Sequence, residues 1–271
     1  TWMVPPCEYA PGPDVGPTLK RYARLFNLSD IGEKLDYPLF MKPYDGGGWV
    51  GVTRIKDDEQ LKNTYSKSGT RVMHLQKSID YDLFVRSIGV GPQVEIVPYD
   101  PSAALHDRYK VGFNVVDAED WQLLTDQQLT INGFFGWEFN SCESLRANGK
   151  YWAIDFANAC PDFQVTSLHF YFPKMVKMML RWSLFCAATG RKMQQMPDWE
   201  PYYAVQRRDL PYRERLSAYA DITREKMQAD AFAEFCHKHL SHLDEVVWEF
   251  FGTDDARAIV REKVASLYPE H

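Results

Sequence analysis

Short apolar runs separated by glycine- and proline-containing turns occupy the N-terminal third of the sequence, a pattern typical of β-strands. Residues 37–42 and 49–55 flank a glycine-rich turn, which predicts a hairpin. Residues 57–69 then begin with three acidic side chains and end at a glycine, the pattern of a capped helix. The sequence therefore predicts the order strand, turn, strand, helix.

Three further runs are rich in β-branched and aromatic residues, and we expect them to form one antiparallel sheet: residues 71–76, 82–90 and 93–98. The apolar spacing of residues 118–129 predicts a helix. Two more strands are predicted at residues 134–140 and 151–156, joined by a turn at Asn148 and Gly149.

The pattern becomes helical from Phe172 onward, where apolar residues recur at three- and four-residue spacing. The proline-rich start of the chain predicts an extended N-terminal segment, with a short helix over residues 18–28. We therefore expect an α+β fold in three parts: an N-terminal segment over 1–34, a mixed α/β domain over 35–190 and a helical region over 191–271.

Composition and charge narrow the class of protein. The chain has 271 residues, 45% of them hydrophobic and 25% charged, which excludes an intrinsically disordered or fibrous chain. The net charge of −6 argues against a nucleic-acid partner. No apolar run approaches the roughly 18 residues that a membrane helix needs. Five cysteines without paired spacing predict reduced thiols, and we expect a cytoplasmic protein that contacts no membrane.

A lysine and three glycines form the first candidate for chemistry. Lys42 ends an apolar strand, and the turn after it contains Gly46, Gly47 and Gly48. Backbone N–H groups of such a turn can face an anion, with the lysine as a point charge near a phosphate. The spacing is neither that of a P-loop nor that of a dinucleotide fingerprint. For a triple glycine taken on its own, a flexible hairpin with an exposed lysine is the favoured explanation.

Two acids form the second candidate. The predicted hairpin around Asn148 should bring Glu138 opposite Asp155, with Asn158 nearby and aromatic residues on either side. Like charges repel across a half-buried sheet, so a divalent cation between them is a simple explanation, and hard oxygen ligands favour Mg²⁺ holding nucleotide phosphates. Two solvated acids, or acids paired with separate cations, are the alternative.

A third stretch, residues 75–91, contains Asp82 and Arg86 in a strand, a turn and a strand. With this stretch between the other two motifs, the sequence resembles the ATP-grasp superfamily, and within it the synapsin and ribosomal-protein glutamate ligase type. The resemblance covers residues 35–165. It implies two α+β subdomains whose antiparallel sheets grip ATP, here followed by a helical C-terminal region.

The resemblance implies the nucleotide contacts. Lys42 corresponds to the lysine on the α- and β-phosphates, and the three turn glycines to a flap over the β- and γ-phosphates. The linker from Gln76 to Ile79 corresponds to the segment that hydrogen-bonds adenine. Asp82 corresponds to the acid near the ribose, and Ile154 to an apolar residue beneath the base.

The resemblance also implies the metal ligands and the cationic groups of catalysis. The Mg²⁺ ligands would be Glu138, Asp155 and Asn158. The candidates for contacts to the γ-phosphate are Arg108 and Lys110. Arg86 is a candidate for the acceptor carboxylate, with a buried or paired structural role as the equal alternative. The family usually has Glu where this chain has Asp155, and its asparagine stands two positions later instead of three. Family members also carry an α/β domain before the lysine strand, so we expect residues 1–34 to be a remnant of such a domain.

The activity that this resemblance implies is an ATP-dependent ligase. A carboxylate would be phosphorylated by ATP, and an amine or other nucleophile would then displace phosphate from the acyl phosphate. The cofactors would be ATP and Mg²⁺, and the partner an unidentified carboxylate substrate. A non-catalytic ATP-binding regulatory protein and a kinase of the same fold are the alternatives. The helical region could mediate a homodimer.

Overall fold

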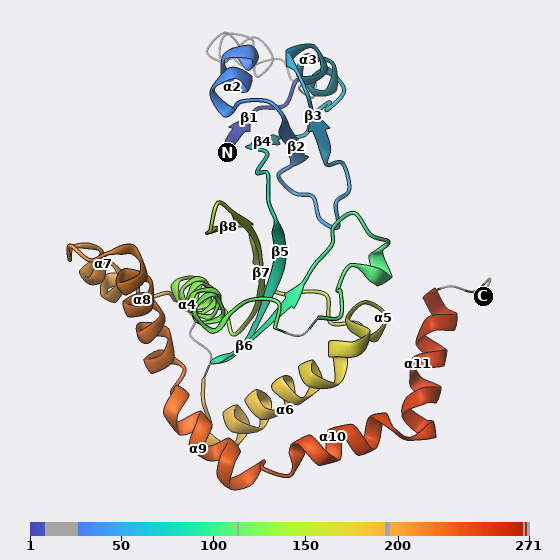
Figure 1. Cartoon of the computed structure of the whole chain (residues 1–271), viewed down its shortest axis with the longest axis vertical. Helices are drawn as coiled ribbons and strands as arrows, with labels where there is room; N and C mark the ends of the chain where they lie inside the picture. Colours follow the sequence, from blue (N-terminus) through green and yellow to red (C-terminus); the bar gives the residue numbers. More distant parts are fainter. Residues whose placement is uncertain (9–26, 113, 193–195, 268, 270–271) are drawn as a thin grey trace, which may run out of the picture. The chain divides into compact units, whose positions relative to one another are not determined.

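A computed structural model of the chain (Figure 1) describes residues 1–8, 27–112, 114–192, 196–267 and 269. It divides into two compact units, Thr1–Asp80 and Tyr81–His271. Each unit has its own antiparallel sheet. Most of the helix predicted over residues 18–28 lies outside the described residues.

The sheet of the first unit has the strand order β1-β4-β2-β3 among the described residues. Its strands are β1 (Trp2–Val4), β2 (Leu39–Pro43), β3 (Thr53–Ile55) and β4 (Met73–Lys77). The predicted hairpin is confirmed, because β2 and β3 pair with Leu39 opposite Ile55. The second strand is shorter than predicted because Trp49 and Gly51 have φ angles of 69° and 76°, which belong to a turn.

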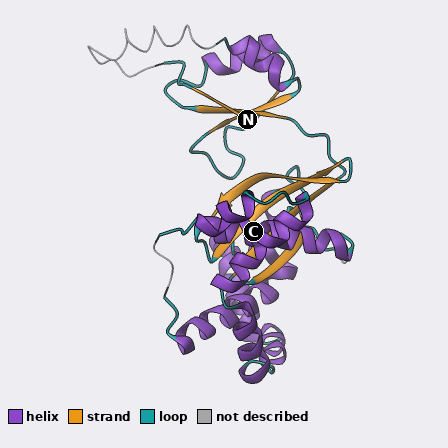
Figure 2. Ribbon diagram, turned by 90° about the vertical axis from the view of Figure 1, so that its left-hand side faces the viewer, coloured by secondary structure: helices purple, strands orange, loops and turns teal. Residues whose placement is uncertain are grey.

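Two helices cover one face of this sheet (Figure 2). They are α2 (Leu28–Leu35) and α3 (Asp58–Ser66). Asp57 caps α3 as predicted, since its carboxylate accepts a hydrogen bond from Gln60 N at 2.8 Å. The core between helices and sheet consists of Val4, Ile31, Leu35, Leu39, Met41, Ile55, Leu61, Met73 and Leu75. Because side chains alternate along a strand, residues between these positions lie on the opposite face.

The sheet of the second unit has the order β6-β5-β7-β8. Its strands are β5 (Leu83–Val90), β6 (Gln93–Pro98), β7 (Phe139–Ala147) and β8 (Lys150–Asn158). The prediction that residues 71–76 share a sheet with the next two strands is wrong, because β4 pairs with β1 and β2. Ser78 N still donates to Pro38 O of the first unit, whereas Asp82 N donates to Arg146 O of the second. The chain therefore changes sheets within residues 78–82.

One face of the second sheet is covered by α4 (Ala118–Phe135). This helix runs six residues further than predicted, and the strand predicted at residues 134–140 is wrong over residues 134–138. Phe134 and Phe135 complete the last helical turn, and Gly136 ends it with a φ of 73° in the left-handed region. β7 therefore begins only at Phe139.

The remaining elements of the second unit are helices, and the prediction of helical structure from Phe172 onward is confirmed. They are η2 (Leu105–Asp107), α5 (Val165–Leu168), η3 (His169–Tyr171), α6 (Phe172–Thr189), α7 (Glu200–Gln206), α8 (Tyr212–Lys226), α9 (Ala229–His239), α10 (Leu243–Phe251) and α11 (Asp254–Leu267). α8 packs against α4, and α6 packs against α9 and α10 (Figure 1). None of the helices in the described residues has the length and apolar character of a membrane span.

Candidate functional site

An acidic pair lies across the β7–β8 hairpin. The register places Glu143 of β7 opposite Asp155 of β8. Glu143 is 8% exposed, whereas Asp155 is exposed. The predicted turn at Asn148 and Gly149 is confirmed, with φ angles of 52° and 69°. The prediction that Glu138 faces Asp155 is wrong, because Glu138 precedes the first residue of β7.

Two irregularities in the ladder set this pairing. Near the turn the register is regular, with Ala147 opposite Lys150 and Ser144 opposite Ala153. It then shifts between Ser144 and Glu143, and again between Glu143 and Ser141. Each shift inserts one extra residue on β8, as a β-bulge does. Without the first shift Asp155 would lie opposite Cys142, whose side chain is on the other face of the strand.

Arg86 of β5 is the cation next to this pair. It is the register partner of Glu143, and its Nη2 lies 3.8 Å from Glu143 Oε1. It also donates Nε–H to Ser141 Oγ at 3.1 Å and Nη1–H to Tyr109 OH at 2.8 Å. Burial opposes the guanidinium charge, but Tyr109 and Glu143 outweigh that effect, and the pKa of Arg86 is raised. Arg86 is therefore a fixed positive charge beside the acids.

Asn158 lies on the same strand as Asp155 and is oriented by β7. It is the register partner of Ser141 and donates Nδ2–H to Ser141 Oγ at 3.1 Å. This hydrogen bond uses the NH₂ group of the Asn158 side chain and not its carbonyl oxygen. Two carboxylates and an amide carbonyl are hard oxygen donors, and Mg²⁺ needs only one or two protein carboxylates when phosphates complete its coordination. These three residues fit a magnesium ion.

No cluster of three or more His, Cys, Asp or Glu side chains suited to a metal occurs in the described part of the chain. The set of two acids and one amide suits a metal that arrives with a phosphate ligand.

The carboxylate of Glu138 has other partners. Trp182 of α6 donates its indole N–H to Glu138 Oε2 at 3.0 Å, and Arg191 lies 3.3 Å from Oε1. The backbone carbonyl of Glu138 accepts from Gly91 N at 2.8 Å. Glu138 thus connects the residues just before β7 with α6 and with the residues that follow α6.

The loop after β6 carries the other two predicted cations. Lys110 forms an ion pair with Asp107 at 2.6 Å, and its backbone N–H donates to Pro98 O. Arg108 donates Nε–H to Ala103 O at 3.2 Å. These contacts hold both residues within the loop.

Asp82, the predicted ribose contact, is bound by an arginine. Arg146 donates to both of its carboxylate oxygens, at 3.0 and 3.1 Å. These hydrogen bonds lower the pKa of Asp82. Ile154, the predicted residue beneath the base, is half-buried on β8. The paired Asp82 remains 65% exposed at its side chain, so the pair is accessible to solvent.

The first unit carries the predicted phosphate and adenine contacts on one face of its sheet. Lys42 is the register partner of His74, and Phe40 is the register partner of Gln76. These four residues alternate with buried core positions and therefore lie on the face without helices. Burial, and then the charge of Lys42, lower the pKa of His74. Ile79 follows β4 in the connection to the second unit.

The glycine turn leaves its backbone open. Gly48 has a φ of 60°, which favours glycine. A Cβ atom on Gly47 or Gly48 would meet no heavy atom within 4 Å. Gly46 N donates to Pro43 O at 3.4 Å, which closes the turn against the strand.

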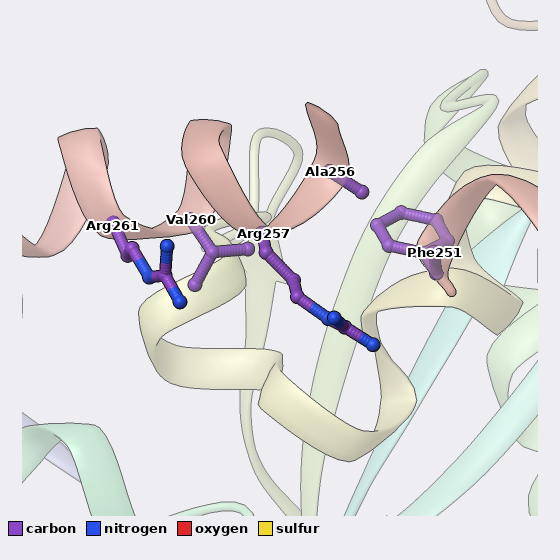
Figure 3. A pocket seen from close by; sticks show the side chains of 5 residues that line it. All are labelled: Phe251, Ala256, Arg257, Val260 and Arg261. Carbon is purple, nitrogen blue, oxygen red and sulfur yellow. The ribbon is translucent and has the colours of Figure 1, made fainter. Parts of the chain in front are cut away.

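A surface hollow of about 240 Å³ lies between α10 and α11 (Figure 3). Its lining consists of Phe251, Ala256, Arg257, Val260 and Arg261. None of the predicted site residues contributes to it.

Sequence reasoning missed Glu143 as the partner of Asp155. The position of the predicted turn contains most of the information needed to find this partner. When Asn148 and Gly149 form a two-residue hairpin turn, counting outward from it pairs Asp155 with Cys142, one residue from Glu143. Glu138 would pair with a residue beyond Asn158.

Comparisons with known proteins give structural similarity without sequence similarity. No family model matches the sequence, and no curated protein matches it. A D-alanine–D-alanine ligase from Bacillus anthracis, complexed with ATP, matches with a TM-score of 0.43 and 14% identity over 86% of this chain and 60% of the ligase. The enzyme of the same name from Helicobacter pylori matches at 0.41 and 12% identity, over 61% and 52%.

A biotin carboxylase from Campylobacter jejuni matches with a TM-score of 0.38 and 15% identity, over 51% of this chain and 34% of that enzyme. The chain thus spans about 60% of the length of the first solved structure that it matches.

Proposed function

We propose that this chain is an ATP-dependent ligase of the ATP-grasp superfamily, which its sequence motifs resemble, and that it joins a carboxylate to an amine or another nucleophile. The observation that supports this most is the pairing of Glu143 with Asp155, followed by Asn158 on the same strand. Two facing acids beside a fixed arginine form a polar arrangement that a metal–phosphate ligand would complete.

In this proposal Glu143, Asp155 and Asn158 hold Mg²⁺. The ion would neutralise charge that develops on the transferred phosphoryl group. Glu138 instead anchors β7, since Trp182 and Arg191 occupy its carboxylate. This assignment replaces the Glu138 ligand expected from the sequence.

The first unit would bind the nucleotide through Lys42 and the backbone of residues 46–48. A lysine is a point charge for phosphate oxygens, and an open glycine turn presents N–H groups. The linker from Gln76 to Ile79 would meet adenine. Asp82 would meet the ribose, either with Arg146 still bound or after exchanging it for the ribose hydroxyls.

The reaction would have two steps. A carboxylate oxygen of the substrate attacks the γ-phosphorus of ATP, and the bond from that phosphorus to the bridging oxygen breaks, so that ADP leaves and an acyl phosphate remains. The nucleophile then attacks the acyl carbon, phosphate leaves, and the nucleophile loses a proton. Arg86, Arg108 and Lys110 are the candidate cations for the phosphoryl oxygens and the acceptor carboxylate. The side chains would act by positioning and charge.

A thermal-shift series with ATP, ADP and AMP, with and without Mg²⁺, tests nucleotide binding. At a hundred times its Kd a nucleotide should stabilise the chain by about 2.7 kcal/mol. We expect stabilisation by ATP and ADP that depends on Mg²⁺. No shift with any nucleotide would contradict the proposal.

Measuring ADP release and the reaction products distinguishes a ligase from a regulatory ATP-binding protein and from a kinase. ADP release should occur with one member of a panel of carboxylates and amines, and Lys42→Met should abolish it. Lys62→Met is the matched control, because Lys62 lies on α3 and pairs with Asp58. Binding without ADP release would favour a regulatory protein, and a stable phosphorylated product a kinase. The expected homodimer through the helical tail stays a prediction, which sedimentation velocity of the whole chain would test.

A further inference from the structure

We propose that Asn140 is a positioning residue for the candidate metal site: its side-chain amide holds the end of β8, and so sets where Asn158 and Asp155 lie. This inference rests on the proposed function. It assigns a role to a buried side chain that belongs neither to the nucleotide contacts nor to the metal ligands.

Asn140 lies in an all-amide cluster inside the second unit. Gln128 and Asn132 come from α4 and Asn140 from β7, and all three are 0% exposed. Buried amides destabilise a core unless hydrogen bonds compensate them, so apolar residues are the usual occupants of such positions. Three of them together require a reason beyond packing.

The cluster connects the helix to the strand. Gln128 donates Nε2–H to Asn132 Oδ1 at 2.8 Å, and Asn140 donates Nδ2–H to the same oxygen at 3.1 Å. Gly89 of β5 makes room for it, because a Cβ atom there would lie 2.6 Å from Asn132 Nδ2. The amide plane of Asn140 is thereby fixed from the side of α4.

The other contacts of Asn140 reach β8. Its Nδ2 also donates to Phe156 O at 3.1 Å, and its Oδ1 accepts from Asn158 N at 3.0 Å. One amide side chain thus binds a backbone carbonyl and a backbone N–H group of β8, the two kinds of group that a neighbouring strand would otherwise bind. The side chain therefore substitutes for a backbone partner at the end of the hairpin.

This substitution occurs where the ladder is irregular. The register shifts on both sides of Glu143, and such shifts leave backbone groups without their regular partners. Asn140 satisfies two of these groups and holds β8 in the shifted register. In that register Asp155 faces Glu143, and the Asn158 side chain reaches Ser141.

Two roles for Asn140 predict different results. If it only stabilised the core, its loss would lower stability and leave metal affinity unchanged. If it positions the ligands, its loss should weaken metal binding in the protein that remains folded. Partners that orient metal ligands typically change metal affinity by about 10- to 100-fold.

The experiment measures Mn²⁺ binding by electron paramagnetic resonance in the presence of ADP, on the full chain. We expect Asn140→Ala to weaken Mn²⁺ binding at least about tenfold. Thr223→Val is the matched control, because Thr223 is also 0% exposed and donates to Leu129 O in the same unit. This control should unfold at lower urea concentration and bind Mn²⁺ as the wild type does.

The outcomes separate the two proposals. If wild-type protein binds no Mn²⁺ with ADP, the proposed function fails. If the wild type binds and Asn140→Ala binds equally well, the positioning role is overturned. Should Asn140→Ala not fold, hydrogen exchange of wild-type protein without metal decides instead. The Asn158 amide should then exchange as slowly as the central amides of β7, and fast exchange would overturn the inference.

Discussion

Glu138 and Glu143 lie five residues apart in sequence and have different surroundings. Glu138 is held by Trp182 and Arg191, whereas Glu143 faces Asp155 and Arg86. Only Glu143 is paired with another acid. Replacing each glutamate in turn by glutamine, a neutral amide of the same shape, therefore distinguishes a metal ligand from a structural anchor.

We expect Glu143→Gln to lower Mg²⁺-dependent nucleotide stabilisation below detection while the chain stays folded, because one acidic ligand is lost. Glu138→Gln should instead destabilise the chain by about 1.5–3 kcal/mol, since hydrogen bonds to a charged group are weakened. Thermal shifts with MgADP and urea unfolding measure the two effects. The reverse pattern would restore the Glu138 ligand that the sequence predicted.

At this scale the sequence predicts residue types better than partners. Asp57 as a helix cap and the turn at Asn148 follow from local chemistry and are confirmed. The pairing of Asp155 depends on two register shifts, and beside them Asn140 and Ser141 bind Asn158, which is 17 or more residues away in sequence. No local pattern contains that information.

At the scale of elements, an ion pair joins β6 to α6, and its contribution to stability should depend on pH. Glu95 of β6 is 6% exposed, and Lys174 of α6 lies 2.6 Å from its carboxylate. Burial raises the pKa of Glu95, although Lys174 and Lys177 oppose this effect. Because the pKa of Glu95 is higher in the folded than in the unfolded chain, its protonation stabilises the folded state. This contribution is complete at pH values below the ordinary pKa of glutamate, and it is lost as pH rises through the pKa of Glu95 in the folded chain.

Lys174→Met should therefore destabilise the chain by about 1.5–3 kcal/mol at pH 7, where Glu95 is charged and has lost its nearest cation. The difference from wild type should shrink as pH falls below the ordinary pKa of Glu95, because the carboxyl group is then protonated in both proteins. Urea unfolding at several pH values measures it, with Lys150→Met as the exposed control. A pH-independent difference would contradict this account.

Element boundaries show why the sequence misleads. The run from Phe134 to Asn140 has the aromatic content of a strand, yet its first two residues belong to α4. Phe134 stacks on Trp199, which precedes α7, and Phe135 stacks on Trp137. Tertiary packing decides between the two structures. The assignment of β4 to the first sheet likewise depends on pairing with β1 and β2, which lie far from it in sequence.

For the whole molecule, the α+β class, the antiparallel sheets and the helical C-terminal region were accessible from periodicity, because each follows from local apolar spacing. The division at Asp80 and Tyr81 was not, since it depends on which strands pair. The proposed site residues are distributed over both units: Lys42 belongs to the first, and Glu143 and Asp155 belong to the second.

A nucleotide that binds both sets of residues should stabilise both units together. Each unit has its own hydrophobic core, so in the absence of ligand each unit can unfold separately, with its own free energy of unfolding. MgADP at a hundred times its Kd adds about 2.7 kcal/mol, which slows exchange about 100-fold for amides that exchange through the opening of a liganded unit. We therefore expect hydrogen exchange to slow in β2 and β4 as well as in β7 and β8. Asp155→Asn should remove this protection from all four strands, because in the proposal Asp155 would hold the metal on which nucleotide binding depends. Protection confined to one unit would contradict the assignment of nucleotide contacts to residues of both units.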